Sequence, residues 1–237
     1  MELMHDIALP PGYRVADVVA FHGRDSEALA EQVDAGCLRK GVLLDGVPTL
    51  LEIRFDGQVA RCRVAFDAPA RTTPKEMAKD ALRNVLGLRI DPAPFAAFAH
   101  DDPVLGPVLA RHPGLRIVQS ATVFEALTWA IIGQQINLSF AIVLRRTLIQ
   151  LAGRPHSSGL WCYPEARDVA RLALDDLTSR KFSTAKAETV LRVARMAVDG
   201  SLSLERSRAA ARVSQELLAI KGIGPWTVNY VLLRGYG

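Results

Sequence analysis

Hydrophobic and polar residues alternate in the first part of the chain as they do in strands. The segment VARCRVAF (59–66) has the two-residue period of a half-buried strand. It follows the apolar runs of VLLDGVPTLLEIRF (42–55), and the Asp-Gly-Gln between the two segments predicts a hairpin turn. Residues 25–36 and 73–88 have helical spacing. Strands with helices on one side predict a small α+β domain over residues 1–95.

The pattern becomes helical from about residue 96 onward. Successive segments such as SATVFEALTWAIIGQQI and STAKAETVLRVARMAVDG place apolar residues three or four positions apart. Each of these segments ends near Gly, Pro or a polar break. Two prolines in RIDPAPF (89–95) indicate the boundary with the first domain. The sequence therefore predicts an all-helical domain over residues 96–237.

The final stretch, LLAIKGIGPWTVNYVLLRGYG (217–237), predicts two helices joined by a glycine-rich hairpin. The first helix should end near Ile220, because Gly222 and Gly224 permit backbone angles closed to other residues and allow another backbone to approach. Pro225 is suited to the first turn of the second helix. The segment is therefore interpreted as a helix–hairpin–helix.

The start of that second helix is a candidate anion site. The N–H groups of Gly224, Trp226 and Thr227 should point outward beside Lys221, where the helix dipole adds partial positive charge. Such a site binds one phosphate and fixes position along a nucleic-acid backbone without reading its sequence. With Gly222, these residues are the candidate contacts to the DNA backbone. A plain αα-hairpin with a glycine turn is the structural alternative.

Composition and charge permit nucleic-acid binding but do not demand it. Lys plus Arg is 29 against 25 for Asp plus Glu, a net charge of +4. The three cysteines, Cys37, Cys62 and Cys162, lie far apart, which disfavours a disulfide framework, a zinc site or an iron–sulfur cluster. No apolar run reaches membrane-spanning length, and no signal peptide is visible. We expect a cytoplasmic protein with no membrane partner, associated with the nucleoid if the source is bacterial.

Several segments together resemble the 3-methyladenine DNA glycosylase II family of the helix–hairpin–helix superfamily. They are VFEALTWAIIGQQIN (123–137), STAKAETVLRVA (183–194) and the hairpin at about 212–234. The N-terminal unit, from PPGYRVADVVAFHGR (10–24) onward, is also similar to that of the family. The resemblance implies a base-excision repair enzyme, most simply a monomer. It would flip an alkylated purine out of duplex DNA and hydrolyse its N-glycosidic bond.

The resemblance also implies an aromatic pocket for the flipped base. Trp226 and Tyr230 lie four residues apart and so share a helix face, and Phe21 matches an N-terminal aromatic of the family. An alkylated purine is cationic and is attracted to aromatic faces. Core packing is the alternative for all three side chains. Strand-cutting relatives carry lysine at the position of Trp226, and an indole forms no Schiff base, which implies a monofunctional hydrolase.

The segment GQQIN (133–137) matches the family region that fills the gap left by the flipped nucleotide. The resemblance makes Gln135, with Ile136 beside it, the candidate wedge. A glutamine there could form hydrogen bonds with the estranged base. A polar residue that simply ends a helix is the alternative.

The family's hairpin also tends to hold a monovalent cation on main-chain carbonyls. In this chain the matching carbonyls are those of Leu218, Ile220 and Ile223. Backbone ligands leave no trace in the side chains, so this site rests on the resemblance alone. No other cofactor is expected.

The family's catalytic aspartate lies shortly after the second hairpin helix, and this chain ends at Gly237, before that position. We therefore assign no catalytic residue and expect that a C-terminal segment is missing. The alternative function is a non-catalytic helix–hairpin–helix module that binds damaged or distorted DNA. A strand-cutting lyase is disfavoured by Trp226.

Overall fold

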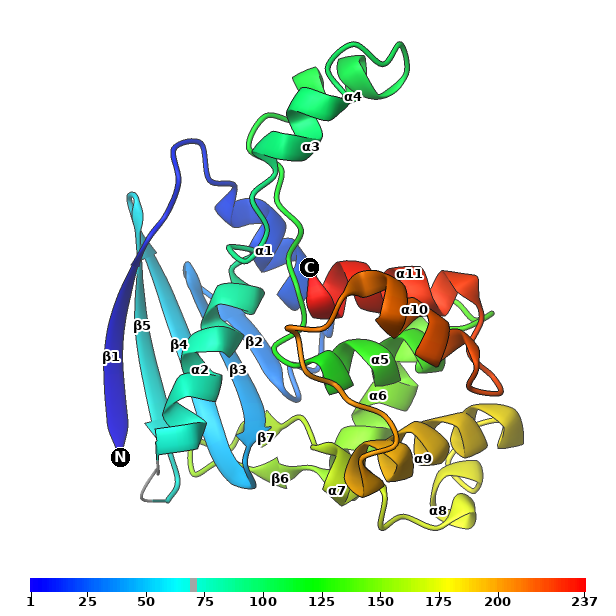
Figure 1. Cartoon of the computed structure of the whole chain (residues 1–237). Helices are drawn as coiled ribbons and strands as arrows, with labels where there is room; N and C mark the ends of the chain where they lie inside the picture. Colours follow the sequence, from blue (N-terminus) through cyan, green and yellow to red (C-terminus); the bar gives the residue numbers. More distant parts are fainter. Residues whose placement is uncertain (69–71) are drawn as a thin grey trace.

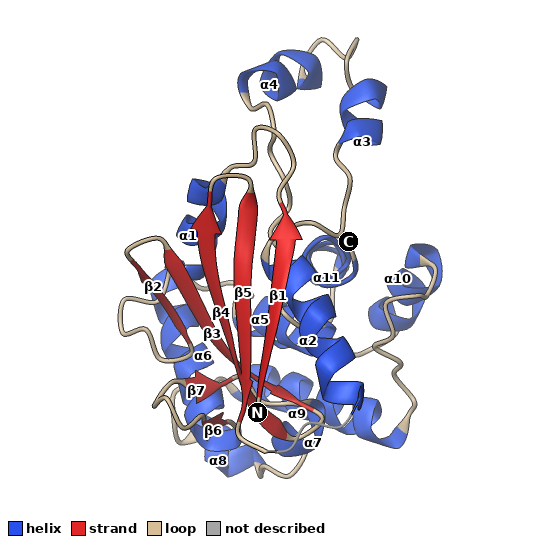
Figure 2. Cartoon of the chain, turned by 90° about the vertical axis from the view of Figure 1, so that its left-hand side faces the viewer, coloured by secondary structure: helices blue, strands red, loops and turns tan. Residues whose placement is uncertain are grey.

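The computed structural model describes residues 1–68 and 72–237, and its first half is built on a five-stranded antiparallel sheet (Figure 1). Two helices of this half, α1 (Val15–His22) and α2 (Thr72–Val85), share a hydrophobic core with the sheet. Figure 2 looks onto the outer face of the sheet, with much of the helical half behind it. The strands in spatial order are β1 (Glu2–Ala8), β5 (Val59–Phe66), β4 (Val47–Asp56), β3 (Cys37–Leu44) and β2 (Glu31–Asp34).

Most of the local predictions for this half are confirmed. The alternating segment 59–66 forms β5, and its residues alternate between more and less buried positions. The hairpin turn before it is present, with Gly57 in the left-handed region at φ +56°. The predicted helix over 73–88 is α2. The α+β fold class is therefore confirmed for the sheet and the helices that pack against it.

The helix predicted over 25–36 is wrong, because part of this segment is strand β2. In the antiparallel pairing of β2 with β3, Glu31 lies opposite Lys40, and both side chains are buried. A strand neighbour that supplies backbone hydrogen bonds and a charged partner outweighs the local helical spacing. Nothing in the sequence pattern indicates that Lys40 lies opposite Glu31.

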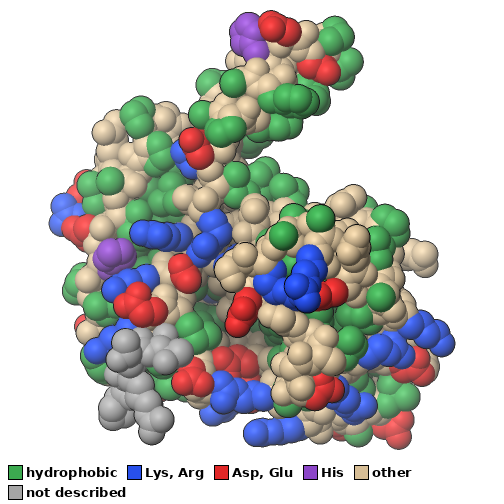
Figure 3. Space-filling model, viewed as in Figure 1, with side chains coloured by type: hydrophobic (Ala, Val, Ile, Leu, Met, Phe, Trp, Pro, Cys, Tyr) green, Lys and Arg blue, Asp and Glu red, His purple; other side chains and the backbone are tan. Residues whose placement is uncertain are grey.

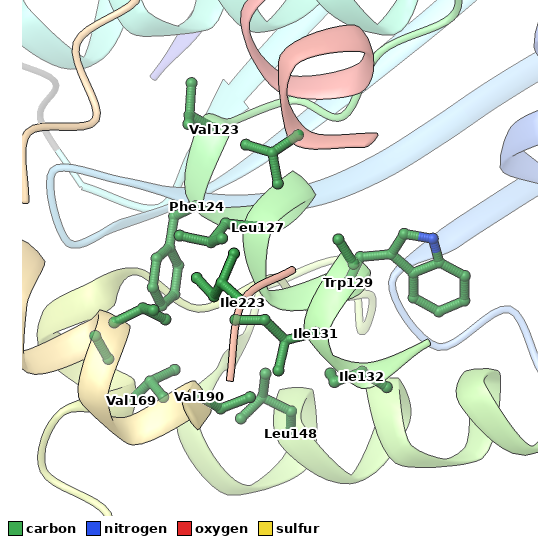
Figure 4. Close-up of a cluster of buried hydrophobic side chains, with 14 of the residues drawn as sticks. Val123, Phe124, Leu127, Trp129, Ile131, Ile132, Leu148, Val169, Val190 and Ile223 are labelled. Carbon is green, nitrogen blue, oxygen red and sulfur yellow. The ribbon is translucent and has the colours of Figure 1, made fainter. Parts of the chain in front are cut away.

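The second half is helical, as predicted. From α5 (Val123–Ile132) onward its helices share one hydrophobic core, and Figure 4 shows buried side chains of α5 and its neighbours. The arm formed by α3 (Ala93–Phe98) and α4 (Leu105–Arg111) projects from the body and carries exposed apolar side chains (Figure 3). The helices are α3 (Ala93–Phe98), α4 (Leu105–Arg111), α5 (Val123–Ile132), α6 (Leu138–Ala152), α7 (Ala166–Val169), α8 (Leu174–Thr178), α9 (Thr184–Asp199), α10 (Ala210–Leu218) and α11 (Pro225–Val231), followed by a π-helical turn (Leu232–Tyr236).

The prediction that this half is all-helical is wrong at one place. A short hairpin of β6 (Arg154–Pro155) and β7 (Trp161–Cys162) lies beside β3. The N–H of Tyr163 donates to the carbonyl of Gly41 at 3.1 Å. A Cβ at Gly41 would lie 2.1 Å from the carbonyl oxygen of Trp161, so the hairpin can approach only because this residue is glycine.

A buried network of charges joins the two halves of the chain. Lys40 Nζ donates to Glu31 Oε1 at 2.6 Å and to Glu125 Oε1 at 2.7 Å. Arg145 Nη2 lies 2.9 Å from Glu125 Oε1 and 3.1 Å from Glu31 Oε2, and His22 Nδ1 lies 2.8 Å from Glu31 Oε1. The network therefore fixes α1 and the sheet against α5 and α6, the elements that flank the candidate site.

Among the described residues, no helix is long and apolar enough to cross a membrane.

Candidate nucleic-acid interface

The glycine hairpin between α10 and α11 uses its two glycines differently. Gly222 has φ +95°, and a Cβ there would lie 2.2 Å from Thr189 Oγ1. Gly222 is therefore required by both the backbone conformation and the packing against α9. Gly224 caps α11, and a Cβ at this position would meet no atom within 4 Å. The surface at Gly224 is thus open to an approaching backbone.

The first turn of α11 has the free N–H donors on which the predicted anion site depends. The first backbone hydrogen bond of this helix runs from the N–H of Val228 to the carbonyl of Gly224, at 3.1 Å. The N–H groups of Trp226 and Thr227 precede that bond and so have no acceptor within the helix. The Thr227 side chain is buried, so this residue can offer DNA only its N–H. Lys221 is exposed beside them.

The loop that carries Gln135 lies directly against this hairpin. Gln134 Nε2 donates to the Gly222 carbonyl at 3.0 Å and to Thr227 Oγ1 at 2.8 Å. Gln135 itself is exposed and has φ +54°, whereas Ile136 is half-buried against the helical core. Of the two candidate wedge residues, Gln135 is therefore the one that projects. A hollow between loop and hairpin is lined by Gly133, Gln134, Gln135, Gly222, Gly224, Pro225, Trp226 and Thr227.

Trp226 lies at the surface beside this hollow. Its side chain is 59% exposed, and its ring centroid lies 5.5 Å from that of Tyr230 with an interplanar angle of 32°. Tyr230 is half-buried against the helical core. Core packing therefore does not explain Trp226.

Two arginines lie beside the ring of Phe21, and one of them comes from the π-helical turn that follows α11. The guanidinium of Arg24 lies 3.9 Å from the centroid of the Phe21 ring and 5.2 Å from that of Trp129. Arg234, one helical turn after Tyr230, places its guanidinium 4.7 Å from the same Phe21 centroid. Figure 4 shows the Trp129 ring on the opposite side of α5 from Phe124. Aromatic side chains from α1 and α5 thus lie beside two cations. Phe21 and Arg234 line one hollow and Trp226 lines another, so the structure does not bring Phe21 and Trp226 together in a single pocket.

The sequence analysis missed three of these residues, Arg24, Trp129 and Arg234. A signal for one of them was present, because Arg234 follows Tyr230 by four positions in a helical pattern. Arg24 lies in the turn after α1, so helical spacing gives no signal for it. Burial lowers the pKa of Arg234, and the charge of Arg24 lowers it further. Arg234 Nη1 donates to the carbonyl of Val118 at 2.5 Å.

The proposed cation ligands are backbone carbonyls at the hairpin, those of Leu218, Ile220 and Ile223. The Ile220 carbonyl accepts the N–H of Ile223 at 3.0 Å and keeps a second lone pair. The carbonyl of Lys221, between these ligands, is occupied by Arg192 Nη1 at 2.7 Å. Uncharged carbonyl oxygens suit a monovalent cation. The site stays a prediction.

The architecture defines a class of protein through its likeness to a solved structure. The structure of a 3-methyladenine DNA glycosylase from Archaeoglobus fulgidus matches 96% of this chain and is covered over 78% of its own length. The TM-score is 0.76 at 22% sequence identity. The chain therefore has the fold of the helix–hairpin–helix DNA glycosylases.

Sequence comparison with curated proteins identifies the family. The chain is 36% identical over 235 residues to the DNA-3-methyladenine glycosylase of Bacillus subtilis, a match that covers 96% of this chain and 78% of that protein. It is 29% identical to DNA-3-methyladenine glycosylase 2 of Escherichia coli over 56% of this chain and 48% of that protein. No family model matches the chain. The chain belongs to the DNA-3-methyladenine glycosylase family, whose members are hydrolases of N-glycosyl bonds.

Proposed function

We propose that this protein is a monofunctional DNA glycosylase that flips alkylated purines such as 3-methyladenine out of duplex DNA and releases them by hydrolysis. The observation that carries the proposal is the exposed Trp226, which stands on the hairpin helix where strand-cutting relatives carry a lysine. An indole nitrogen forms no Schiff base with the sugar, so strand cleavage by that route is closed. We expect the protein to act as a monomer.

The hairpin would hold one phosphate of the damaged strand. Lys221 supplies a charge, the N–H groups of Trp226 and Thr227 supply donors, and the bare backbone of Gly224 allows close approach. These contacts are independent of base sequence, as a protein that scans DNA for lesions requires.

The flipped base would stack on Trp226, with Tyr230 beside it, and Phe21 is a further candidate from the neighbouring hollow that it lines with Arg234. Stacking on an aromatic side chain contributes about 1–3 kcal/mol per base. Flipping costs a few kcal/mol, and less for a damaged base, so the stack offsets much of the cost. Gln135 would fill the gap that the base leaves in the duplex.

A monovalent cation on the carbonyls of Leu218, Ile220 and Ile223 would support the hairpin from within. When bound, the ion would add positive charge behind the phosphate site. The residues of the turn would still make the contacts to DNA.

The decisive experiment measures the release of free base from methylated duplex DNA, with chromatography of the supernatant. The assay is run with residues 1–237 and with the full product of the gene, and we expect the full product to release alkylated purines, leave an abasic site and form no covalent adduct after borohydride reduction. An adduct trapped by borohydride would refute the monofunctional assignment. No release by residues 1–237 alone would agree with an aspartate that lies outside them, whereas no release by the folded full product that still binds the duplex would refute excision and favour the non-catalytic binding module.

A further inference from the structure

Helix α9 supports the turn of the hairpin with side chains that recur every three residues. Lys186, Thr189 and Arg192 therefore lie along one side of this helix. Thr189 packs where a Cβ of Gly222 would be, and Arg192 Nη1 donates to the Lys221 carbonyl at 2.7 Å. The turn that offers the phosphate site is thus held from behind by two residues of α9.

The third of these residues holds the neighbouring loop. Lys186 Nζ donates to the carbonyls of Gln134 and of Ile131, the latter at 3.5 Å. The side chain of Gln134 in turn donates to Gly222 and Thr227 of the hairpin. Gln134 therefore connects three elements, since its carbonyl contacts α9 and its amide contacts both the turn and the first turn of α11.

The ammonium group of Lys186 has an unusual set of partners. It is half-buried, and within the described ranges no carboxylate lies within ion-pair distance of it, so backbone carbonyls are its acceptors. Burial lowers the pKa of Lys186. Holding a charge there is costly unless its hydrogen bonds are kept, so the lysine ties the loop to α9.

These contacts fix the residue that projects from the loop. Gln135 adopts a left-handed conformation that is unfavourable for a residue other than glycine, and the contacts of Gln134, the residue before it, support that conformation. With Gln134 bound to the hairpin, Gln135 lines the same hollow as Gly224 and Trp226 of the proposed phosphate site.

We propose that Gln134 and Lys186 are positioning residues that lock the loop of Gln135 onto the hairpin, so that phosphate binding and insertion of Gln135 into the duplex are coupled. The inference rests on the proposed DNA-binding function and assigns a role to two residues that need not touch DNA. It also explains why segments 133–137 and 183–194, far apart in the chain, lie beside the hairpin.

The test uses a duplex with 2-aminopurine opposite a tetrahydrofuran abasic site, and an undamaged duplex of the same sequence. Fluorescence of 2-aminopurine reports insertion, and anisotropy reports affinity. Gln134→Ala removes two neutral hydrogen bonds, so insertion should fall about tenfold or more. Affinity for the undamaged duplex should change less than about twofold, since phosphate contacts dominate it. In a Gln135→Ala background, Gln134→Ala should have no further effect on insertion.

Two more variants separate positioning from general stability. Gln134→Glu keeps the size of the side chain but removes its donors at pH 7. Insertion should therefore recover in part relative to wild type as pH falls to about 4, where much of the carboxyl is protonated and can donate one hydrogen bond. Lys186→Arg should retain more insertion than Lys186→Met, because it keeps the charge and the donors. Gln150→Ala, on the exposed side of α6, is the matched control and should change nothing.

Equal loss of affinity for both duplexes on Gln134→Ala would overturn the proposal. It would also be overturned if the loss of insertion in the double variant equalled the product of the losses caused by Gln134→Ala and Gln135→Ala separately. A lack of recovery of Gln134→Glu at low pH would overturn it too. None of these measurements needs release of a base. Failure of the positioning role is therefore distinguishable from failure of the proposed excision activity.

Discussion

Replacing Lys40 by Met should be among the most destabilising single changes in this protein. Lys40 is fully buried and lies within 2.7 Å of both Glu31 and Glu125. Its loss leaves two buried carboxylates with Arg145 as their remaining buried cation. Breaking a buried ion pair by removing one partner costs about 3–5 kcal/mol. That is a large fraction of a total stability of about 5–15 kcal/mol.

A double variant tests whether charge balance is the cause. Lys40→Met combined with Glu31→Gln leaves one carboxylate, Glu125, opposite Arg145, which restores neutrality. The amide that replaces Glu31 can still form a hydrogen bond with His22. We therefore expect the double variant to recover at least half of the lost stability, although it carries one more substitution than the single variant.

Urea unfolding followed by circular dichroism measures both effects, provided that the m-value stays constant. Lys79→Met is the matched control, because Lys79 pairs with Glu76 at the surface and its loss should cost no more than about 0.5 kcal/mol. A loss below about 1 kcal/mol for Lys40→Met, or no recovery in the double variant, would refute the reasoning.

Three further predictions concern the hairpin, the pocket and pH. Gly222→Ala should lower stability by roughly 1–3 kcal/mol, because the site has positive φ and no room beside Thr189, whereas Gly224→Ala should fold normally; thermal unfolding of both variants compares them. Trp226→Ala should reduce base release at least tenfold with little change in affinity for an abasic duplex, and equal losses would place its role outside base recognition. Burial lowers the pKa of His22, so its contribution to stability is present above the unfolded pKa of about 6.5 and is lost on acidification. His22→Gln should therefore weaken the dependence of the urea midpoint on pH between pH 7 and 5.5. A pH dependence equal to that of the wild type would contradict this prediction.

Features that depend on neighbours in the chain could be predicted from the sequence. The hairpin follows from Gly222, Gly224 and Pro225, which set backbone angles within a few residues. Strand β5 follows from strict alternation, and the helices of the second half from their apolar spacing. The position of Trp226 in the first turn of α11 could also be predicted, because Trp226 directly follows Pro225.

Features that depend on partners distant in the chain could not be predicted. Glu31 lies in a strand because Lys40 lies opposite it, although its own segment has helical spacing. Arg24 reaches the aromatic site because α1 packs beside the turn that carries Arg234. Nothing in the local sequence of Gln134 indicates that its amide binds the hairpin.

The sequence by itself thus determined the helix–hairpin–helix, because a helix, a glycine turn and a helix that begins with proline are encoded by adjacent residues. Only the tertiary structure decided which residues from other parts of the chain lie beside the hairpin. It places Gln135, Trp226 and the aromatic cluster at set distances through contacts among α1, α5, α9 and α11. Such contacts come from burial and hydrogen bonding across the fold, and local pattern does not specify them.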